Sequence, residues 1–355
     1  MDKIRLSLML TTALLMTSCG QDITEDPEPS KGLVALQLSS GISVSKTRAF
    51  DTTWEGGNAI GVFTTVKGDK TKITKSGSLD DANIGYQINS ELNTYDAGTY
   101  TYGSFTPTSQ NKKIYLPVDG SPIDVYAYYP YNNTVSATDP LVVEIPTTQT
   151  LPNQKTIDVL MADTASTTEH PIDIDNPEVK LLFRHVMSKV IVYVMPGVGF
   201  SEADLAGEKV SSVQLLKQPK DATFAPVTQE LAITAGEHTI TMQEITDSSD
   251  PDYATETNYT IPNTEPAETK KIKHTYRAII LPNNDTNPVA TGEGVRQIKF
   301  NVGDTYYTYD ITEPFESGKQ YIFAMRLSAT GVEVTAAIKD WSHETITPNP
   351  LYPQN

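Results

Sequence analysis

The chain has 355 residues, 38% of them hydrophobic and 20% charged, a length that fits about two domains with hydrophobic cores. Its 21 glycines and 23 prolines are near the average for globular proteins, which excludes collagen-like and low-complexity chains. Acidic residues outnumber basic ones by 44 to 27, giving a net charge of −17. Because binding to phosphates needs a surplus of Lys and Arg, this charge argues against nucleic acid as a partner.

Residues 1–18 have the composition of a signal peptide. Lys3 and Arg5 give a positive start, and the apolar stretch 6–16 is too short to remain as a membrane-spanning helix. The following sequence Met16-Thr17-Ser18-Cys19 resembles the lipobox of bacterial lipoproteins. It predicts lipidation of Cys19 and a stable membrane anchor, because several acyl chains hold a protein where one is marginal. The alternative is an ordinary secretory signal with a chance cysteine.

Residues 19–32 are predicted to form an acidic tether, because they carry four acids and two prolines and are too polar to pack. The acids close behind Cys19 also resemble the surface-export signal of some Gram-negative lipoproteins, although any acidic linker has the same composition. Cys19 is the only cysteine. Once it is lipidated, the mature chain has no thiol for disulfides, Cys-ligated metals or nucleophilic catalysis.

From Leu33 onward, apolar and polar residues alternate with a period of two, which predicts an all-β protein. β-Branched and aromatic residues fill the runs, and Gly, Pro, Asn and Asp separate them, as in β-sandwiches. One short helix is expected after Ser201, where Ser201 and Asp204 match a capping box. The strand-like runs are residues 33–44, 60–66, 123–131, 181–186, 188–194, 298–302, 307–311, 321–327 and 332–338.

A polar stretch at 162–178 that contains two prolines interrupts the strand pattern. It places a domain boundary near residue 175, so that residues 33–175 are predicted to form an N-terminal β-sandwich and residues 176–341 a C-terminal one. Residues 342–355 follow as a proline-rich tail with Pro348, Pro350 and Pro353. Proline lacks the N–H that a strand ladder needs, so this tail is a poor candidate for strand pairing.

The familiar catalytic motifs are missing from the sequence. It has no GxSxG, HExxH or Walker pattern, and its five histidines are scattered without metal-ligand spacing. Acid-rich loops at 173–178 and 247–252 lack the glycine and the spacing of a calcium loop. We therefore predict no enzyme, no metal and no cofactor, although a carboxylate pair for glycoside hydrolysis has no sequence signature.

Two further clusters each have two interpretations. Tyr126, Tyr128, Tyr129 and Tyr131 form an aromatic run that would stack on carbohydrate if exposed. Alternation places Tyr126 and Tyr128 on the opposite face from the other two, and this pattern favours a strand with core on one side and rim on the other. The basic residues at 270–277 are interpreted as a charged sheet edge that opposes mispairing.

The first predicted strand is followed by a candidate cleavage site. Val34, Leu36 and Leu38 alternate, and the segment ends at Lys46-Thr47-Arg48-Ala49, which a trypsin-like protease would cut. A cut between Arg48 and Ala49 would detach the strand from the rest of the chain. Loss of a strand exposes an apolar groove with unpaired backbone groups, which an extended segment of another molecule can fill. The alternative is that Arg48 is an ordinary loop arginine.

Seven motifs occur in a fixed order along nearly the whole chain. They are the lipobox at Cys19, TRA at 47–49, Trp54 with GNAIGVF at 57–63, VYAYYPY at 125–131, LFRHVMSKVIVYV at 182–194, GKQYIFAMRL at 318–327 and VEVTAAIKDW at 332–341. Together they resemble the fimbrillin family, the subunits of type V pili.

This resemblance implies two tandem transthyretin-like β-sandwich domains in a lipoprotein of the outer membrane, at the cell surface and in fimbriae. It implies an arginine-specific protease that cuts Arg48–Ala49, and partners that are other pilus subunits, joined by exchange of the N-terminal strand for a neighbour's C-terminal strand. The donor would then come from residues 332–341, unless these are a permanent part of the second domain. The position as stalk, tip or anchor stays open, and a surface glycan-binding lipoprotein is the second candidate function.

Overall fold

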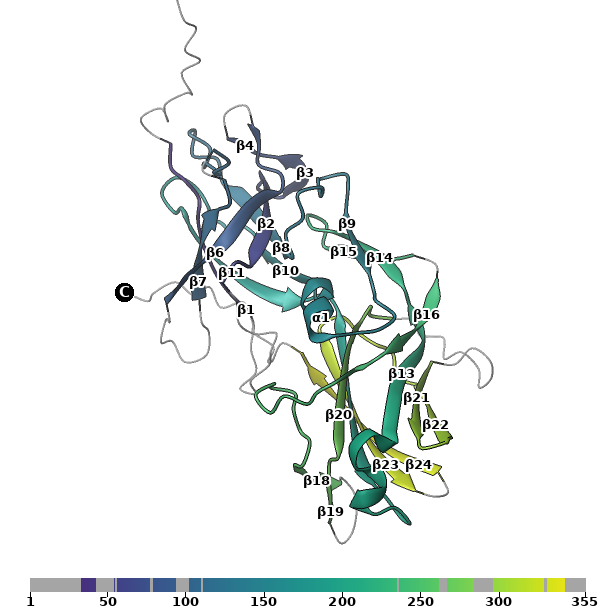
Figure 1. The fold of residues 1–355 in the computed structure, drawn as a ribbon. Coiled ribbons are helices and arrows are strands. Elements are labelled where there is room, and N and C mark those ends of the chain that lie inside the picture. The colour runs from purple at the N-terminus through teal and green to yellow at the C-terminus, as the bar shows by residue number, and fades with distance from the viewer. Residues whose placement is uncertain are drawn as a thin grey trace, which may run out of the picture. The chain divides into compact units, whose positions relative to one another are not determined.

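The computed structural model describes residues 33–42, 54, 56–76, 79–93, 102–109, 111–234, 236–261, 267–283, 296–328 and 331–341. The signal peptide, the acidic tether, Cys19, the Arg48–Ala49 bond and the proline-rich tail lie outside these residues. Within them the regular structure is mostly β-strands, arranged in several sheets, with one α-helix and two short 3-10 helices (Figure 1). The prediction of an all-β protein is confirmed.

The first sheet joins eight strands in the order β3-β2-β6-β7-β1-β11-β10-β8, and β2 also pairs with β8. This extra pairing closes a ring, from which only β3 is left out. The strands are β1 Gln37–Ile42, β2 Ala59–Val66, β3 Asp69–Ile73, β6 Ile84–Asn93, β7 Tyr102–Pro107, β8 Ile123–Tyr129, β10 Leu160–Thr164 and β11 Glu178–His185. A two-stranded ribbon, β4 Lys75–Ser76 and β5 Leu79–Asp80, lies between β3 and β6 in the sequence.

Inward-facing residues of this closed sheet form one hydrophobic cluster. Alternate residues of β8 divide between two cores, as the period of two predicts. Ile123, Val125 and Ala127 belong to the cluster of the first sheet, whereas Tyr126 and Tyr128 belong to the larger cluster of the second half of the chain. The predicted alternation of the tyrosine run is confirmed, but the expected rim is wrong, because both faces of β8 pack in a core.

The second half of the chain, together with β9 of the first half, forms a five-stranded, a four-stranded and a three-stranded sheet, in the orders β17-β20-β12-β23-β24, β16-β13-β21-β22 and β15-β14-β9, with a ribbon β18-β19. Their strands are β9 Leu141–Glu144, β12 Ser188–Pro196, β13 Val210–Pro219, β14 Asp221–Ala225, β15 Glu230–Ile233, β16 Glu237–Thr241, β17 Gln243–Glu244, β18 Asn258–Ile261, β19 Glu268–Lys271, β20 His274–Ile280, β21 Gln297–Val302, β22 Thr305–Asp310, β23 Lys319–Ser328 and β24 Gly331–Asp340. β12 lies at the centre, parallel to β23 and antiparallel to β20.

Strand pairing crosses the predicted boundary at residue 175 in both directions. β11 begins after it and yet pairs with β1 and β10 of the first sheet. β9 ends well before it and pairs with β14 of the second half. Contacts accordingly place Val34–Asn355 in one compact unit, and the division at residue 175 stays a prediction.

The helices are short. The capping box at Ser201 is confirmed, but it begins a 3-10 helix, η2 Glu202–Leu205, which is followed by η3 Gly207–Lys209. The α-helix, α1 Leu151–Ile157, has no counterpart in the prediction. It spans only seven residues with a proline in its first turn, so it shows no helical period. Its start is fixed locally, because the Thr150 N–H donates to Asn153 Oδ1 at 2.8 Å.

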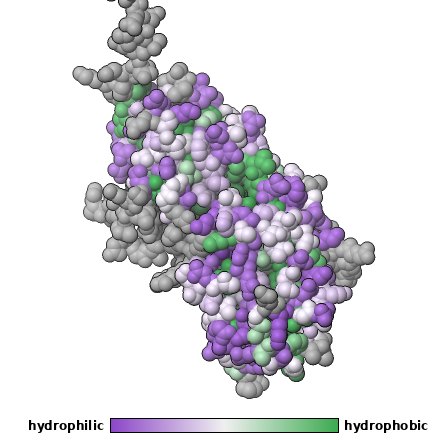
Figure 2. Space-filling view, in the orientation of Figure 1, coloured by the Kyte–Doolittle hydropathy of each residue, from purple (hydrophilic) through white to green (hydrophobic). Residues whose placement is uncertain are grey.

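The surface is mostly hydrophilic, as the composition predicts, with small separate apolar areas (Figure 2). One of these areas lies over the three-stranded sheet, where Val142 and Ile233 are 71% and 42% exposed (Figure 2). Among the described residues no helix has both the length and the hydropathy to cross a membrane.

Candidate functional site

β1 is a central strand of the first sheet. It pairs with β7 in the antiparallel direction and with β11 in the parallel direction (Figure 1). Leu38 lies opposite Phe105 on one side and Val179 on the other. β7 and β11 are not paired with each other, so the space between them, which we call the β1 groove, is filled by β1 alone.

The residues just before β1 extend the pairing. The Leu36 N–H donates to the Ile114 carbonyl at 3.0 Å, and the Leu116 N–H donates to the Val34 carbonyl at 2.8 Å. Tyr86 supports this segment, because its hydroxyl accepts the Ile114 N–H at 3.2 Å. Burial raises the pKa of Tyr86 to about 12, so the hydroxyl stays neutral in this apolar place.

Among the described side chains of this N-terminal segment, two leucines are buried in the core. Leu36 and Leu38 are 2% and 4% exposed, and Val34 packs against the same cluster while partly exposed. Every other member of the cluster comes from elsewhere in the chain. Removing β1 would therefore leave most of the core in place, but it would expose two rows of unpaired backbone groups on β7 and β11.

Trp54 spans the inner side of the β1 groove. Its ring makes edge contacts with Phe105 of β7 at 5.5 Å and with Phe183 of β11 at 5.1 Å between ring centroids, and with Tyr129 of β8 at 5.6 Å. The residue is 6% exposed. Its buried Nε1–H has no hydrogen-bond partner among the described residues, so the indole is held by packing.

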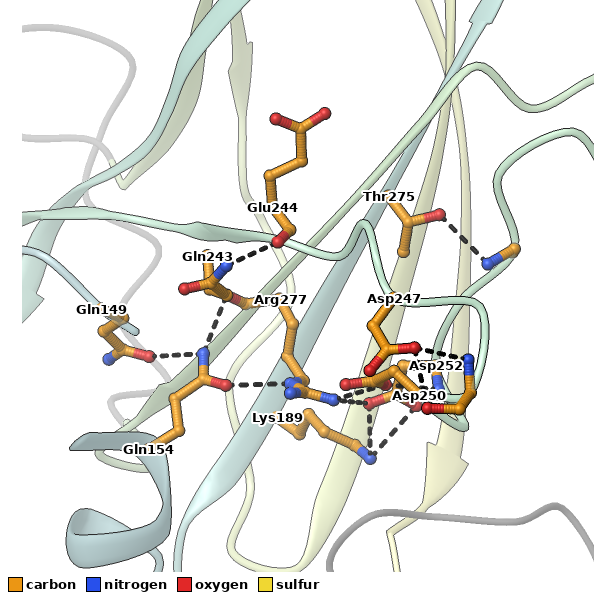
Figure 3. Close-up of polar contacts among 12 residues, drawn as sticks. Gln149, Gln154, Lys189, Gln243, Glu244, Asp247, Asp250, Asp252, Thr275 and Arg277 are labelled. Atoms are coloured by element: carbon orange, nitrogen blue, oxygen red, sulfur yellow. Dashed lines mark hydrogen bonds and ion pairs between the residues drawn. The ribbon is translucent and has the colours of Figure 1, made fainter. Parts of the chain in front are cut away.

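A second site, in the other half of the chain, is polar and buried (Figure 3). Nη1 of Arg277 on β20 lies 2.9 Å from Asp250 Oδ1 and 2.9 Å from Asp252 Oδ2. Nζ of Lys189 on β12 lies 3.2 Å from the same Asp252 oxygen. The side chains of Arg277 and Lys189 are 1% and 0% exposed. Two cations thus face two carboxylates in a buried site. This network is stable only while all four groups are present, because the loss of one leaves a buried charge without its partner.

Two glutamines connect this ion network to helix α1. The Arg277 Nε–H donates to Gln154 Oε1 at 2.9 Å, and Gln154 Nε2 donates to Gln149 Oε1 at 3.1 Å (Figure 3). Gln149 in turn exchanges hydrogen bonds with the backbone of Ile279, at 2.6 and 2.8 Å. The helix that precedes β10 of the first sheet is therefore bonded to the sheet of the second half.

The end of β24 is held by an aromatic stack. The Trp341 ring lies 3.9 Å from the His185 ring at an angle of 3°, and Lys189 Nζ lies 5.2 Å from its centroid. His185 Nδ1 is 2.9 Å from Asp158 Oδ1, directly after α1. Trp341 is 2% exposed, and its N–H donates to the Gly318 carbonyl at 2.7 Å. β24 thus ends in a contact with the last residue of β11.

A surface cavity of about 550 Å³ lies beside His274, Glu244, Ser211 and Ser212. A serine, a histidine and a carboxylate are the residue types of a catalytic triad, but the hydrogen bonds of His274 do not have the arrangement of a triad. His274 Nδ1 lies 2.7 Å from Glu244, and Nε2 lies 2.6 Å from the Leu205 carbonyl. The second nitrogen is therefore occupied and has no contact with a serine. Burial opposes charging of the ring, but the bonds to Glu244 and Leu205 outweigh it, so the pKa of His274 is raised.

The structure tests only part of the predicted chemistry. Cys19, Arg48 and Ala49 lie outside the described residues. Tyr126 and Tyr128 are 5% and 0% exposed, so they offer no stacking surface to a sugar. The acid-rich loop at 173–178 bonds internally, with Asp173 Oδ1 accepting backbone N–H groups. Among the described residues, no group of three His, Cys, Asp or Glu side chains is placed to hold a metal.

The chain has counterparts among known proteins. The sequence pattern of the family described as fimbrillin-like matches residues 47–341. The chain belongs to the fimbrillin-like family. Membership of this family makes the chain a structural protein of fimbriae and not an enzyme.

Individual relatives agree with this assignment. The fimbrillin-like chain is 29% identical, over 348 residues and 96% of both chains, to a Bacteroides uniformis protein named as a fimbrium subunit, Fim1C. A crystal structure named as a cell adhesion protein of Bacteroides uniformis has 27% identity and a TM-score of 0.60, covering 87% of this chain and 99% of that one. A second, from Bacteroides ovatus, has 20% identity and a TM-score of 0.59 over 88% and 99% of the two chains, and it shows the shared fold alone.

Several residues that organise these sites have no clear signal in the sequence. Trp54 was part of a family motif, but nothing in the pattern indicated that it spans two strands. Arg277 and His274 were assigned to an exposed sheet edge, and both are buried, at 0% and 6% exposure. That interpretation is wrong for these two residues. The available signal is their place in a strand whose other residues are apolar or aromatic, HTYRAII.

Proposed function

We propose that the chain is a structural subunit of a surface fimbria of the type V pilus kind. It is exported as a lipoprotein, acylated at Cys19 and tethered to the outer membrane by residues 19–32. An arginine-specific protease cuts the Arg48–Ala49 bond, β1 leaves, and a strand from the C-terminal region of a neighbouring subunit takes its place. In this proposal residues 33–175 and 176–341 are two tandem transthyretin-like sandwiches, with the exchanged strand in the first.

The observation that carries the proposal is the contrast between the pairing and the packing of β1. The strand has ladder partners on both sides, so its departure creates a groove that demands another strand. Among its described side chains, β1 gives Leu38 to the core, with Leu36 just before it, and most of the described cluster comes from other segments. The bond proposed for cleavage lies six residues beyond Ile42 in the sequence.

The relatives support the same reading. A fimbrium subunit is the printed name of the Bacteroides uniformis relative, and cell adhesion that of the similar structure. The glycan-binding alternative loses the residues on which it depended, because Tyr126 and Tyr128 are buried in a core. No other observation favours it.

The C-terminal region contains two candidate donors. β24 has the alternation of a core-facing strand, whereas the tail beyond it carries three prolines that weaken any ladder. We therefore assign the donor to β24. In a free subunit β24 pairs with β23 at ten positions, so donation requires that it first separate from β23.

Protease treatment of the purified precursor tests the polymerisation step. An arginine-specific protease should convert the wild-type protein into a ladder of SDS-resistant oligomers. The Arg48→Gln variant should stay monomeric. Arg184→Gln, which removes an exposed arginine elsewhere, should polymerise like wild type. A wild-type product that is cut after Arg48 and remains monomeric would sink the proposal.

Lipidation is tested separately in the native host. Mass spectrometry of the mature N-terminus should find acyl chains on Cys19. Cys19→Ser should lose them and leave the membrane fraction. An unmodified, membrane-free wild-type protein would refute the lipid anchor while leaving strand exchange intact.

A further inference from the structure

β1 and β24 carry matching side-chain patterns. The six residues of β1, QLSSGI, align with residues 333–338, EVTAAI, so that the apolar residues at the second and last positions coincide and small residues fill the three positions between them. The residue before each segment is also apolar. The pairs are Leu36 with Val332, Gln37 with Glu333, Leu38 with Val334, Ser39 with Thr335, Ser40 with Ala336, Gly41 with Ala337 and Ile42 with Ile338.

Small residues occupy the middle of both segments, and the β1 groove has a reason for them. Trp54 contacts Phe105, which lies at the level of Leu38, and Phe183, which lies at the level of Ile42. The position midway between these levels is 40, which pairs with Gly103 and Leu181. β7 and β11 are about 10 Å apart across the missing middle strand. An indole that bridges them therefore occupies room that a large residue at position 40 would need.

We propose that Trp54 is the register-setting residue of the groove, and that β24 of a second copy enters it with Ala336 at position 40. This inference rests on the proposed strand exchange and adds its register. Val332 and Val334 then replace Leu36 and Leu38 in the core, and Ile338 takes the position of Ile42. Trp54 acts by excluding other registers.

The need for such a residue follows from strand geometry. A slip by one residue turns every core side chain to the opposite face and is rejected by the alternation itself. A slip by two residues leaves every side chain on the same face of the sheet, so the alternation does not exclude it. It would bring Val334 or Ile338 to position 40 against the indole. Only a difference in size distinguishes these registers, and overpacking a buried site is unfavourable.

The place of Trp54 in the sequence suits this task. It follows the Arg48–Ala49 bond by five residues, so it stays with the subunit when β1 leaves. Its contacts are to β7, β8 and β11 and to aromatic rings outside β1. Trp54 therefore remains in the β1 groove after β1 has left, and it sets the register of the incoming β24 as it set that of β1.

A double-mutant cycle on the uncut, full-length protein tests the proposed coupling between position 40 and Trp54. Ser40→Leu should lower the Tm, and it should lose most of this effect when combined with Trp54→Leu, which frees the space. Ser39→Leu, at the neighbouring position of opposite parity, should show no coupling to residue 54. If Trp54→Leu does not fold, Trp54→Phe replaces it. Additive effects at positions 40 and 54 would overturn the proposal.

Strand exchange in solution tests the register itself. Residues 45–48 are replaced by the recognition sequence of a site-specific protease, the full chain is cut, and a labelled peptide of residues 331–341 is added. The peptide should displace β1. Its Ala336→Leu version should bind about tenfold or more weakly, a loss typical of overpacking. Ala337→Leu should bind like the parent, and Trp54→Leu protein should accept both versions.

The two experiments separate the two claims. If no peptide displaces β1 but residues 40 and 54 are coupled, strand exchange fails as the function and Trp54 still sets the register of β1. If the parent peptide and its Ala336→Leu version bind equally well, exchange stands and the register-setting role of Trp54 is wrong.

Discussion

The two terminal strands of the described chain are held in opposite ways. β1 has neighbours on both sides, and the described side chains of Gln37, Leu38 and Ser39 form neither an ion pair nor a hydrogen bond. β24 has one neighbour, β23, but it is also anchored by side chains. Arg326 of β23 lies 3.0 Å from Glu333, and the strand ends in the buried Trp341.

This difference separates backbone contacts, which another strand can make, from side-chain contacts, which need particular residues. Backbone pairing is the same for any strand, so β1 can be exchanged for a segment with a similar alternation. Side-chain anchors such as the stack of Trp341 on His185 depend on particular residues. The N-terminal region is therefore suited to release its strand, and the C-terminal region to keep its own until the anchor is lost.

The largest expected effect lies in the buried ion network of the second half. Asp252→Ala removes the carboxylate shared by Lys189 and Arg277 and leaves a surplus of buried positive charge. The free energy of unfolding should fall by about 3–5 kcal/mol, as for other broken buried pairs, measured by urea denaturation. Asp69→Ala removes an exposed pair with Lys72 and should have a much smaller effect, because water screens exposed ion pairs. Equal losses in the two variants would show that the network is not a special anchor.

Trp341→Ala should have the next largest effect. It removes the ring that stacks on His185 and lies near Lys189, at a cost of about 3 kcal/mol. Hydrogen exchange should then speed up along β24 from its C-terminal end, and little along β1. Trp341→Phe keeps a stacking ring and should preserve most of the protection. Uniform loosening of both strands would contradict the distinction between them.

Leu38→Ala sharpens the comparison at the other strand. It should lower the free energy of unfolding of the uncut protein by about 2 kcal/mol, the low end for a buried leucine, because the rest of the cluster comes from other segments. Once β1 has been cut and replaced by a peptide of residues 331–341, the variant and the wild type should have equal Tm values. A persisting difference would mean that β1 had not left.

Much of this architecture was accessible from the sequence, since the strands with clean alternation, such as β8, β21 and β24, lie where the pattern predicts. What the sequence did not reveal depends on residues far apart in the chain. The closed first sheet requires β11 to pair with β1, across 140 residues, and no local pattern encodes such a pairing. The sequence did not predict helix α1, because a helix of seven residues is too short to show a helical period of apolar residues.

The candidate site divides in the same way. The alternation at Val34, Leu36 and Leu38 indicated a strand that contributes to a core, and the structure confirms it. The contacts of Trp54 were not predictable, because they join three strands. Arg277 was misassigned because a charged residue is normally exposed, and only the tertiary arrangement supplies Asp250 and Asp252 as partners.

The smallest expected effect concerns pH, and it also distinguishes the two regions. Both ring nitrogens of His274 face acceptors, Glu244 and the Leu205 carbonyl, so the folded state favours the imidazolium and its pKa lies above the usual value of about 6.5. The contribution of His274 to the free energy of unfolding is fully present below the pKa that this residue has in the unfolded chain. It is lost as the pH rises through the pKa of His274 in the folded protein.

The Tm of the wild type should therefore fall as the pH rises above about 6.5. His274→Gln, which cannot titrate, should flatten this part of the profile. Lys273 faces the same ring and opposes its charge, so Lys273→Gln should move the fall to higher pH. Because none of the described residues that pair with β1 is a histidine, the rate at which a cut β1 exchanges should not change over the same range. An exchange rate that followed the titration of His274 would show that the two regions are coupled.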